Sequence, residues 1–255
     1  MKPHAERTRT WLFDLGNSRL KRAPADALTT AGTLALAHAG TLDEATLATA
    51  CDGICAGDRA WLASVASSAA SDALLAALRR CGATVSRATT HTELAGLRIA
   101  YAQPERLGVD RFLAMLAAHA RARQPWLVVG VGTALTIDLL AADGSHRGGL
   151  IAPSPTLMRS ALSQRATHLP IAGGRIVDFA SDTADALASG TVLAARALIE
   201  RSRQAARRLL GIAPALLIAG GGADALLAGW RVRVTHAPDL VLEGLARYAD
   251  VPARD

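Results

Sequence analysis

Lysine, cysteine and aromatic residues are scarce in this sequence. Of its 28 basic residues only Lys2 and Lys21 are lysines, and aromatic residues make up 4%. The core must therefore be built from Ala, Leu and Val, and the first two favour helices. The three cysteines, Cys51, Cys55 and Cys81, are an odd number without a regular framework, which argues for a reducing compartment. Cys51 and Cys55 have no further ligand type nearby, so we expect no metal site there.

The sequence also lacks a long uninterrupted apolar run. Segment 1–10 is polar and contains no apolar signal-peptide core. The most apolar stretch, 126–142, is roughly 17 residues long, which is marginal for a membrane span. It is interrupted by Gly130, Thr136 and Asp138, so a buried strand, a turn and a second strand fit it better. A soluble cytoplasmic protein is expected.

The bulk composition excludes a disordered chain. Hydrophobic residues are 51% and charged residues 20% of the 255 residues, enough for a sizeable core. The formal net charge of +6 could attract nucleic acid, membranes or anionic small molecules. The arginines are scattered, apart from small clusters at 79–80 and 201–208, and no aromatic-and-basic recognition pattern accompanies them. We therefore interpret the second cluster as a solvated helix face rather than a nucleic-acid-binding surface.

The hydrophobic pattern predicts the same order of elements twice. Each half opens with a strand, a turn of small residues and two further strands, and helices follow. We expect two α/β halves, 1–124 and 125–255, with turns from both facing a cleft between them. The expected strands are 11–14, 18–23, 33–38, 60–64, 84–88, 126–129, 135–140, 149–152 and 216–218. The expected helices are 42–50 (with a capping box from Thr41 to Glu44), 71–81, 111–123, 156–164, 183–210 and one from 223.

The two turns have the composition of phosphate-binding loops. Small residues at 16–18 and 132–134 allow backbone N–H groups to approach an anion closely. Asp14, at the end of the first strand, could hold Mg²⁺ directly or through water. Taken singly, each turn is more often structural. Their matching positions in the two halves favour phosphate handling.

Three further stretches could carry chemistry. Asp110 and Arg111 follow Gly108 at the start of a helix, where Asp110 could be a base and Arg111 an anion clamp, or Asp110 a simple helix cap. Segment 148–170 could border a substrate pocket or merely be a loop and a covering helix. The glycines at 220–222, between a strand and a helix, suit an approaching nucleotide but do not form a dinucleotide fingerprint.

With these segments in order, the chain resembles the type III pantothenate kinases, the family also named for Bvg accessory factor. The likeness covers nearly the whole chain and lies in the order and spacing of several short motifs. They are Asp14-Leu15-Gly16-Asn17-Ser18, Gly108-Val109-Asp110-Arg111 after Tyr101 and Pro104, Gly132 to Asp138, Gly148-Gly149, Thr167 to Pro170, Thr183 with Ser189-Gly190, the glycines at 220–222, and 238–245.

The resemblance implies an actin-like, sugar-kinase-like fold of two ribonuclease-H-like halves, working as a homodimer. It implies ATP-dependent phosphorylation of pantothenate to 4'-phosphopantothenate, with Mg²⁺, at the first step of coenzyme A biosynthesis. In the dimer, helix 183–210 is our candidate interface through Leu193, Ala194, Leu198 and Ile199, although this face could simply cover the sheet.

The family's site residues carry over to matching positions of this chain. Asp110 would be the base that accepts the proton of the pantothenate hydroxyl. Pantothenate would be contacted by Tyr101, Gly108, Val109, Asp110, Arg111 and Thr183, the last from across the dimer interface. ATP would be bound by Asp14, Leu15, Gly16, Asn17, Ser18, Lys21, Gly132, Thr133, Gly221 and Gly222, with Asp14 as the metal ligand.

One position departs from the family pattern. Many members carry an Asp where this chain has Gly130, and that Asp is tied to a site for K⁺ or NH₄⁺. We expect monovalent-cation dependence to be reduced or met differently. One alternative function is a nucleic-acid-binding accessory protein, but Asp14, Asp110 and Asp138 would repel a DNA backbone. A second alternative is another kinase or phosphatase on the same fold.

Overall fold

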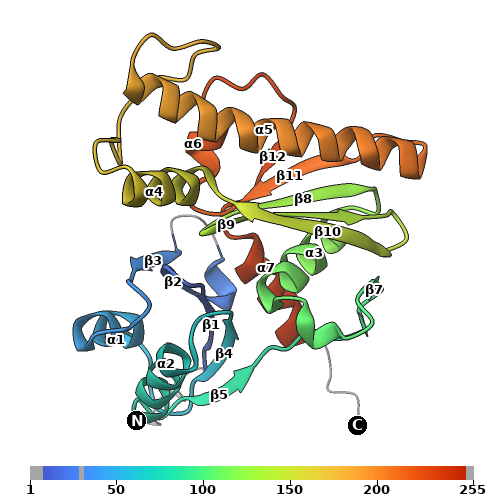
Figure 1. Cartoon of the computed structure of the whole chain (residues 1–255). Helices are drawn as coiled ribbons and strands as arrows, with labels where there is room; N and C mark the ends of the chain where they lie inside the picture. The colour runs from blue at the N-terminus through green and yellow to red at the C-terminus, as the bar shows by residue number, and fades with distance from the viewer. Residues whose placement is uncertain (1–7, 29–31, 251–255) are drawn as a thin grey trace, which may run out of the picture. The chain divides into compact units, whose positions relative to one another are not determined.

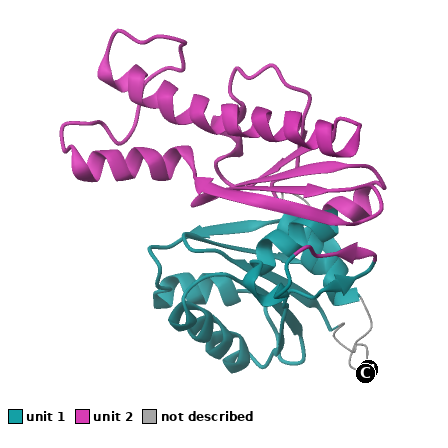
Figure 2. Ribbon diagram, turned by 45° about the vertical axis from the view of Figure 1, so that its right-hand side comes forward, with its two compact units in different colours: residues 1–95, 101–117, 239–255 teal, residues 96–100, 118–238 magenta. Residues whose placement is uncertain are grey.

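The computed structural model describes residues 8–28 and 32–250 (Figure 1). Most of the polar N-terminal segment discussed above, residues 1–7, lies outside them. The chain divides into two compact units (Figure 2). Unit 1 comprises 1–95, 101–117 and 239–255, and unit 2 comprises 96–100 and 118–238. The division at residue 124 that we expect from the sequence stays a prediction.

The strands and helices alternate along the chain as a mixed α/β protein requires. The strands are β1 Thr10–Leu15, β2 Arg19–Pro24, β3 Leu34–Ala37, β4 Arg59–Ser64, β5 Thr84–Arg87, β6 Glu93–Leu94, β7 Leu97–Arg98, β8 Trp126–Val131, β9 Ala134–Leu140, β10 His146–Pro153, β11 Ala215–Ala219 and β12 Thr235–His236. The helices are α1 Glu44–Cys51, α2 Ser68–Arg80, α3 Val109–Arg121, α4 Pro155–Arg165, α5 Thr183–Leu210, α6 Ala223–Leu227 and α7 Leu240–Asp250, with 3₁₀ turns at η1 Ala25–Ala27 and η2 Pro104–Arg106.

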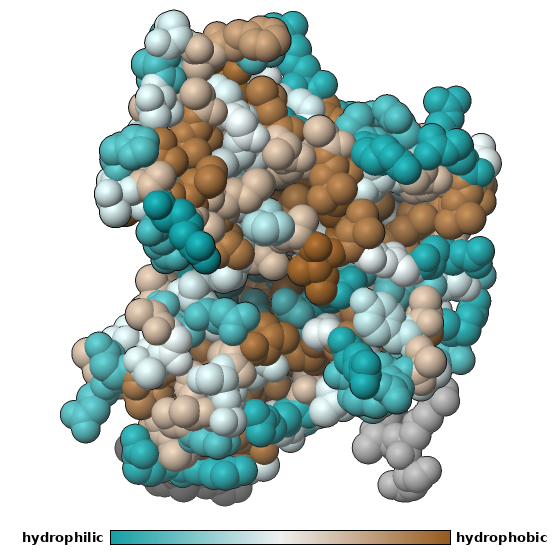
Figure 3. Space-filling model, viewed as in Figure 1, coloured by the Kyte–Doolittle hydropathy of each residue, from teal (hydrophilic) through white to brown (hydrophobic). Residues whose placement is uncertain are grey.

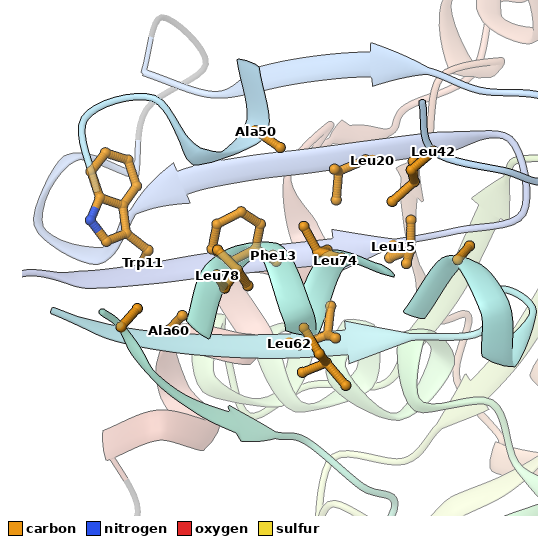
Figure 4. Close-up of a cluster of buried hydrophobic side chains, with 13 residues drawn as sticks. Trp11, Phe13, Leu15, Leu20, Leu42, Ala50, Ala60, Leu62, Leu74 and Leu78 are labelled. Carbon is orange, nitrogen blue, oxygen red and sulfur yellow. The ribbon is translucent and has the colours of Figure 1, made fainter. Parts of the chain in front are cut away.

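The sheet of unit 1 has the strand order β3-β2-β1-β4-β5. The first three strands are antiparallel neighbours, whereas β4 runs parallel to β1 and β5 parallel to β4. Side chains from β1, β4 and α2 meet over one face of this sheet, including Phe13, Leu62, Leu74 and Leu78, all fully buried (Figure 4). This packing fixes β1 in the middle of the sheet and with it the direction of Asp14.

The sheet of unit 2 repeats this topology with other residues. Its order is β10-β9-β8-β11-β12, in which β8, β9 and β10 are antiparallel and β11 and β12 add in parallel. Its core contains Val129, Ile137 and Ile199, with Leu198 packed against it. Leu198 and Ile199 of α5 therefore cover the sheet. Of the two roles considered for them from the sequence, dimer interface or cover of the sheet, the structure shows the second.

Several element boundaries differ from the sequence expectations because side chains cap the helices elsewhere. Helix α1 begins after Asp43, whose carboxylate accepts a hydrogen bond from the Thr46 N–H at 2.8 Å, so the capping box from Thr41 is wrong. Helix α2 begins three residues earlier than expected, after the cap Ser67. Helix α7 was not assigned from the sequence at all, and it packs against β1, β2 and β4 of unit 1.

Among the described residues, none of the helices is both long and apolar enough to cross a membrane.

Candidate active site

The turn between β1 and β2 is held by backbone and histidine hydrogen bonds. The Gly16 N–H donates to the Arg19 carbonyl at 2.9 Å, which closes a short loop with Asn17 and Ser18 exposed at its tip. His38 accepts the Gly40 N–H on Nδ1, so its Nε2–H donates to the Gly16 carbonyl at 3.0 Å. Sequence reasoning did not single out His38. The loop is thus held at Gly16, and its tip is exposed.

Asp14 lies directly opposite Lys21 in the antiparallel pairing of β1 with β2. Opposed residues of such a pair project on the same face of the sheet. The pKa of Asp14 is raised from its ordinary 3.8 to about 7, chiefly by burial and then by the negative charge of Asp110, with a smaller contribution from Asp239. The ammonium of Lys21 opposes the increase. Three carboxylates and one ammonium therefore share this part of unit 1.

Asp239 is a member of this group that sequence reasoning missed. It lies in the motif 238–245, and its carboxylate accepts hydrogen bonds from Lys21 Nζ at 3.1 Å and from Thr33 Oγ1 at 3.0 Å. Nothing in its neighbours along the chain indicates this role, because its partners lie more than 200 residues away. Only the folding of α7 onto the first sheet brings it there.

Asp14 is the residue of unit 1 that could hold a divalent cation. No cluster of three or more His, Cys, Asp or Glu suitable for a metal occurs in the part of the chain that is described. A single carboxylate is nevertheless enough for Mg²⁺, which keeps several of its waters and adds phosphate oxygens as ligands. Asp110 and Asp239 repel the negative charge of Asp14, and a bound cation would reduce this repulsion.

The Gly108-Val109-Asp110-Arg111 stretch forms the start of α3. Gly108 precedes the helix, and the buried Val109 anchors its first turn. Asp110 Oδ1 accepts the Arg111 N–H at 2.8 Å, so the carboxylate is oriented by the backbone next to it. Asp110 lies inside the first turn, where the helix dipole also favours negative charge.

Arg111 and Tyr101 are brought together although they are ten residues apart. The Arg111 guanidinium donates to Tyr101 Oη at 3.3 Å, and its central carbon lies 5.9 Å from the centre of the tyrosine ring. The arginine is 6% exposed, whereas Tyr101 is only half-buried. A nearly buried guanidinium held in place by an aromatic hydroxyl is suited to bind the carboxylate of a small ligand.

In unit 2, the glycines at 220–222 pack against the end of β8 beside the turn at Gly132 and Thr133. The Gly222 N–H donates to the Val131 carbonyl at 3.0 Å. Gly220 has φ +97°, and a Cβ on it would meet the Val131 carbonyl oxygen at 2.5 Å. The positive φ and the close approach of the Val131 carbonyl both require glycine at position 220. Gly132, Thr133 and Gly221 are exposed, so the surface of this part of unit 2 consists of small residues, which allow a phosphate or a nucleoside to approach closely.

Asp138 of the Gly132–Asp138 motif and Gly130, two residues before that motif, have structural roles. Asp138 is buried and accepts a hydrogen bond from His146 Nε2 at 3.0 Å, so it belongs to the interior of unit 2. Gly130 is paired with Thr136 across β8 and β9, and a Cβ on Gly130 would lie 2.6 Å from Thr136 Oγ1. The local structure is adapted to glycine at this position.

Thr183 is the first residue of α5 and is exposed. The cap residue before it, Asp182, accepts the Asp185 N–H at 2.9 Å. Within unit 2, Thr183 therefore lies at the exposed N-terminal end of a long helix.

Comparisons with known proteins agree with these features. The family model described as type III pantothenate kinase matches residues 11–205. A type III pantothenate kinase of Stenotrophomonas maltophilia (strain K279a) is 54% identical over 239 residues, covering 94% of this chain and 96% of the relative. One from Xanthomonas axonopodis pv. citri is 51% identical over 240 residues, with the same coverage of both chains.

Solved structures show the fold. A conserved putative Baf family transcriptional activator from Campylobacter jejuni has a TM-score of 0.62 at 19% identity, over 93% of this chain and 96% of that one. MreB5 of Spiroplasma citri bound to ADP has a TM-score of 0.50 at 12% identity, over 95% and 96%. The fold is the one that these two structures share, and the chain belongs to the type III pantothenate kinase family.

Proposed function

We propose that this protein transfers the terminal phosphate of ATP to the hydroxyl of pantothenate, the first step of coenzyme A biosynthesis. The observation that carries the proposal is the arrangement at the start of α3. An oriented carboxylate, Asp110, adjoins a nearly buried guanidinium, Arg111, that Tyr101 holds in place. A carboxylate base beside a clamp for an anionic acceptor is what the reaction needs from the protein.

On the acceptor side, Arg111 binds the carboxylate of pantothenate and Tyr101 contacts its chain. Asp110 accepts the proton of the attacking hydroxyl, and its main task is to orient that hydroxyl. Gly108 and Val109 set the position of Asp110, since the first leaves room for its carboxylate and the second anchors the helix.

On the nucleotide side, Asp14, Gly16, Asn17, Ser18 and Lys21 face the terminal phosphate, with Leu15 buried below them as an anchor. Asp14 is the proposed Mg²⁺ ligand. When bound, Mg²⁺ supplies positive charge that offsets the charge of the phosphates. In unit 2, the residues that we propose for ATP binding are Gly132, Thr133, Gly221 and Gly222, whose small size allows close approach.

The homodimer is supported by an apolar groove on unit 2. The groove has a volume of about 720 Å³ and is lined by Pro153, Leu157, Met158, Ala161 and Leu162, with Ala186, Leu187, Gly190 and Thr191 of α5 on its other side. Apolar surface gathers over α4 and β10 (Figure 3), where Leu150, Ile151, Leu157 and Leu162 are exposed. A second copy that covers this face would also bring its own Thr183 near it, because Thr183 precedes Ala186 by one turn.

Three further properties belong to the proposal. The protein works in the cytoplasm. Its dependence on K⁺ or NH₄⁺ is weak, because Gly130 offers no carboxylate. Nucleic acid is not a partner, because the neighbouring carboxylates Asp14, Asp110 and Asp239 would repel its phosphate backbone.

The function is tested by ADP release in the presence of Mg-ATP, with and without pantothenate. Pantothenate-dependent release is the expected result. Release that does not depend on pantothenate, or salt-sensitive DNA binding without any turnover, would contradict the proposal.

A further inference from the structure

We propose that Asp239 is a positioning residue, which holds the ammonium of Lys21 beside Asp14 so that it can bind the phosphates of ATP. This inference rests on the proposed function and adds to it a residue from the far end of the chain.

The contacts of Asp239 fix its carboxylate from two sides. Oδ1 accepts Lys21 Nζ at 3.1 Å, and Oδ2 accepts the Thr33 hydroxyl at 3.0 Å. The side chains of Lys21 and Asp239 are 16% and 10% exposed, so both are largely removed from water. A bond between two charged groups in such surroundings is stronger than one at the surface.

The backbone on both sides of the pair is rigid. Lys21 lies in the middle of β2, which pairs with β1 on one side and with β3 on the other. Asp239 immediately precedes α7, and its carbonyl accepts the Glu243 N–H at 3.0 Å, which starts the helix. Because α7 packs on β1 and β2, the Asp239 carboxylate is delivered to a defined point over the sheet.

The position of the pair indicates a role beyond stability. A largely buried ion pair contributes little net stability compared with well-packed apolar groups, because both charges must be desolvated. Lys21 lies opposite Asp14 in the strand pairing, at the base of the loop that carries Asn17 and Ser18. A lysine on a long flexible stem loses side-chain entropy when it binds phosphate, and a carboxylate that restrains it in advance reduces that cost. Protein kinases use a lysine–glutamate pair for the same purpose.

Lys21 also provides an unusually clean readout. Because Lys2 and Lys21 are the only lysines, acylation by an amine-selective reagent can be followed at Lys21 by mass spectrometry, with Lys2 as the internal reference. The full-length protein is compared as wild type, Asp239→Asn, Asp239→Glu, Lys21→Met and the double variant Lys21→Met/Asp239→Asn. Asp239→Asn keeps an acceptor for Thr33 and removes only the charge.

We expect Asp239→Asn to lower kcat/KM for ATP about tenfold, while KM for pantothenate stays within about twofold of wild type. Asp239→Glu should recover part of the loss. In the Lys21→Met background, Asp239→Asn should have almost no further effect, because it acts through a side chain that is no longer present. Acylation of Lys21 relative to Lys2 should be faster in Asp239→Asn than in wild type, and Mg-ATP should slow it in wild type.

The inference is overturned if the decreases in kcat/KM for ATP caused by Lys21→Met and by Asp239→Asn multiply in the double variant. It is also overturned if Asp239→Asn leaves both kcat/KM for ATP and the acylation of Lys21 unchanged. A purely structural Asp239 would lower the melting temperature without this coupling. If wild type shows no pantothenate-dependent turnover, the proposed function fails. The acylation rate and its protection by Mg-ATP then still decide whether Asp239 positions Lys21 for nucleotide.

Discussion

A Cβ added to Gly108 would stand 2.6 Å from Oδ1 of Asp110. The atom that it meets is the end of a side chain, so the structure can yield at small cost in stability by turning the carboxylate away. Gly108 therefore keeps open the space in which the proposed base is oriented by the Arg111 N–H.

The first prediction concerns Gly108→Ala. We expect kcat to fall by up to about 100-fold, because a catalytic group displaced by about 1 Å can cost that much. The melting temperature should change little. Steady-state kinetics and thermal unfolding check both parts, with Asp110→Asn as the comparison. An unchanged kcat in Gly108→Ala would show that the orientation of Asp110 is not important.

The second prediction concerns the pH dependence of stability. The folded-state pKa of Asp14, about 7, lies above its ordinary value of 3.8, so the folded state holds the proton more tightly than the unfolded state. The contribution of Asp14 is most favourable below about pH 4 and is lost as the pH rises through 7. The charged groups that face Asp14 are Asp110, Asp239 and Lys21, and they surround both its protonated and its ionised form.

Asp14→Asn keeps the shape of the side chain without its charge. Relative to wild type, it should raise the melting temperature clearly at pH 8 and hardly at pH 4.5, measured without divalent cation. Mg²⁺ should reduce the difference at pH 8, because it binds the wild-type carboxylate. A difference of equal size at both pH values would contradict the assignment.

The third prediction separates the two costs of replacing a glycine in unit 2. Gly220 and Gly229 both have positive φ, +97° and +71°, but only Gly220 has a backbone oxygen in the way of a Cβ. Gly229→Ala should cost about 1 kcal/mol, as expected for a left-handed alanine. Gly220→Ala should cost clearly more and also weaken ATP binding. Denaturant unfolding of the two variants measures this, and equal losses would contradict the close packing at Val131.

The fourth prediction concerns the monovalent cation. Activity of wild type in K⁺ should differ little from activity in Na⁺, because Gly130 supplies no carboxylate ligand. The double variant Gly130→Asp/Thr136→Ala, in which the second change removes the hydroxyl 2.6 Å from the added Cβ, should gain K⁺ activation. Strong K⁺ activation of wild type would contradict the prediction.

The fifth prediction concerns the apolar groove. Leu162 is 47% exposed on α4 and lines the groove, whereas Leu209 is 58% exposed near the end of α5 and does not. Leu162→Glu should convert the dimer into monomers, since it buries a charge in the proposed interface. Leu209→Glu is the matched control and should leave the dimer intact. Sedimentation velocity distinguishes these outcomes, and a wild-type monomer would remove the proposal.

The sequence predicts most elements and their repeated order along the chain, because their periodicity and turn residues are local. Helix α5 was predicted from Thr183 to Leu210, and both limits are confirmed, since Asp182 caps its start and Gly211, with φ +73°, ends it. The start of α1 was wrong because Thr41 and Asp43 are both acceptable caps, and only the fold chooses between them.

For the site, the motifs identified Asp14, Asp110 and Arg111, but their partners arise from tertiary packing. Asp239 reaches Lys21 only through the docking of α7, and His38 reaches Gly16 only through the pairing of β2 with β3. No local pattern encodes either contact.

The most direct test of the account is the rate of ADP release with pantothenate and Mg-ATP for wild type and Asp110→Asn. We expect pantothenate-dependent turnover in wild type and its collapse in the variant. Turnover that survives in Asp110→Asn would contradict Asp110 as the base, and wild type without pantothenate-dependent turnover, in K⁺ and in NH₄⁺, would contradict the kinase itself.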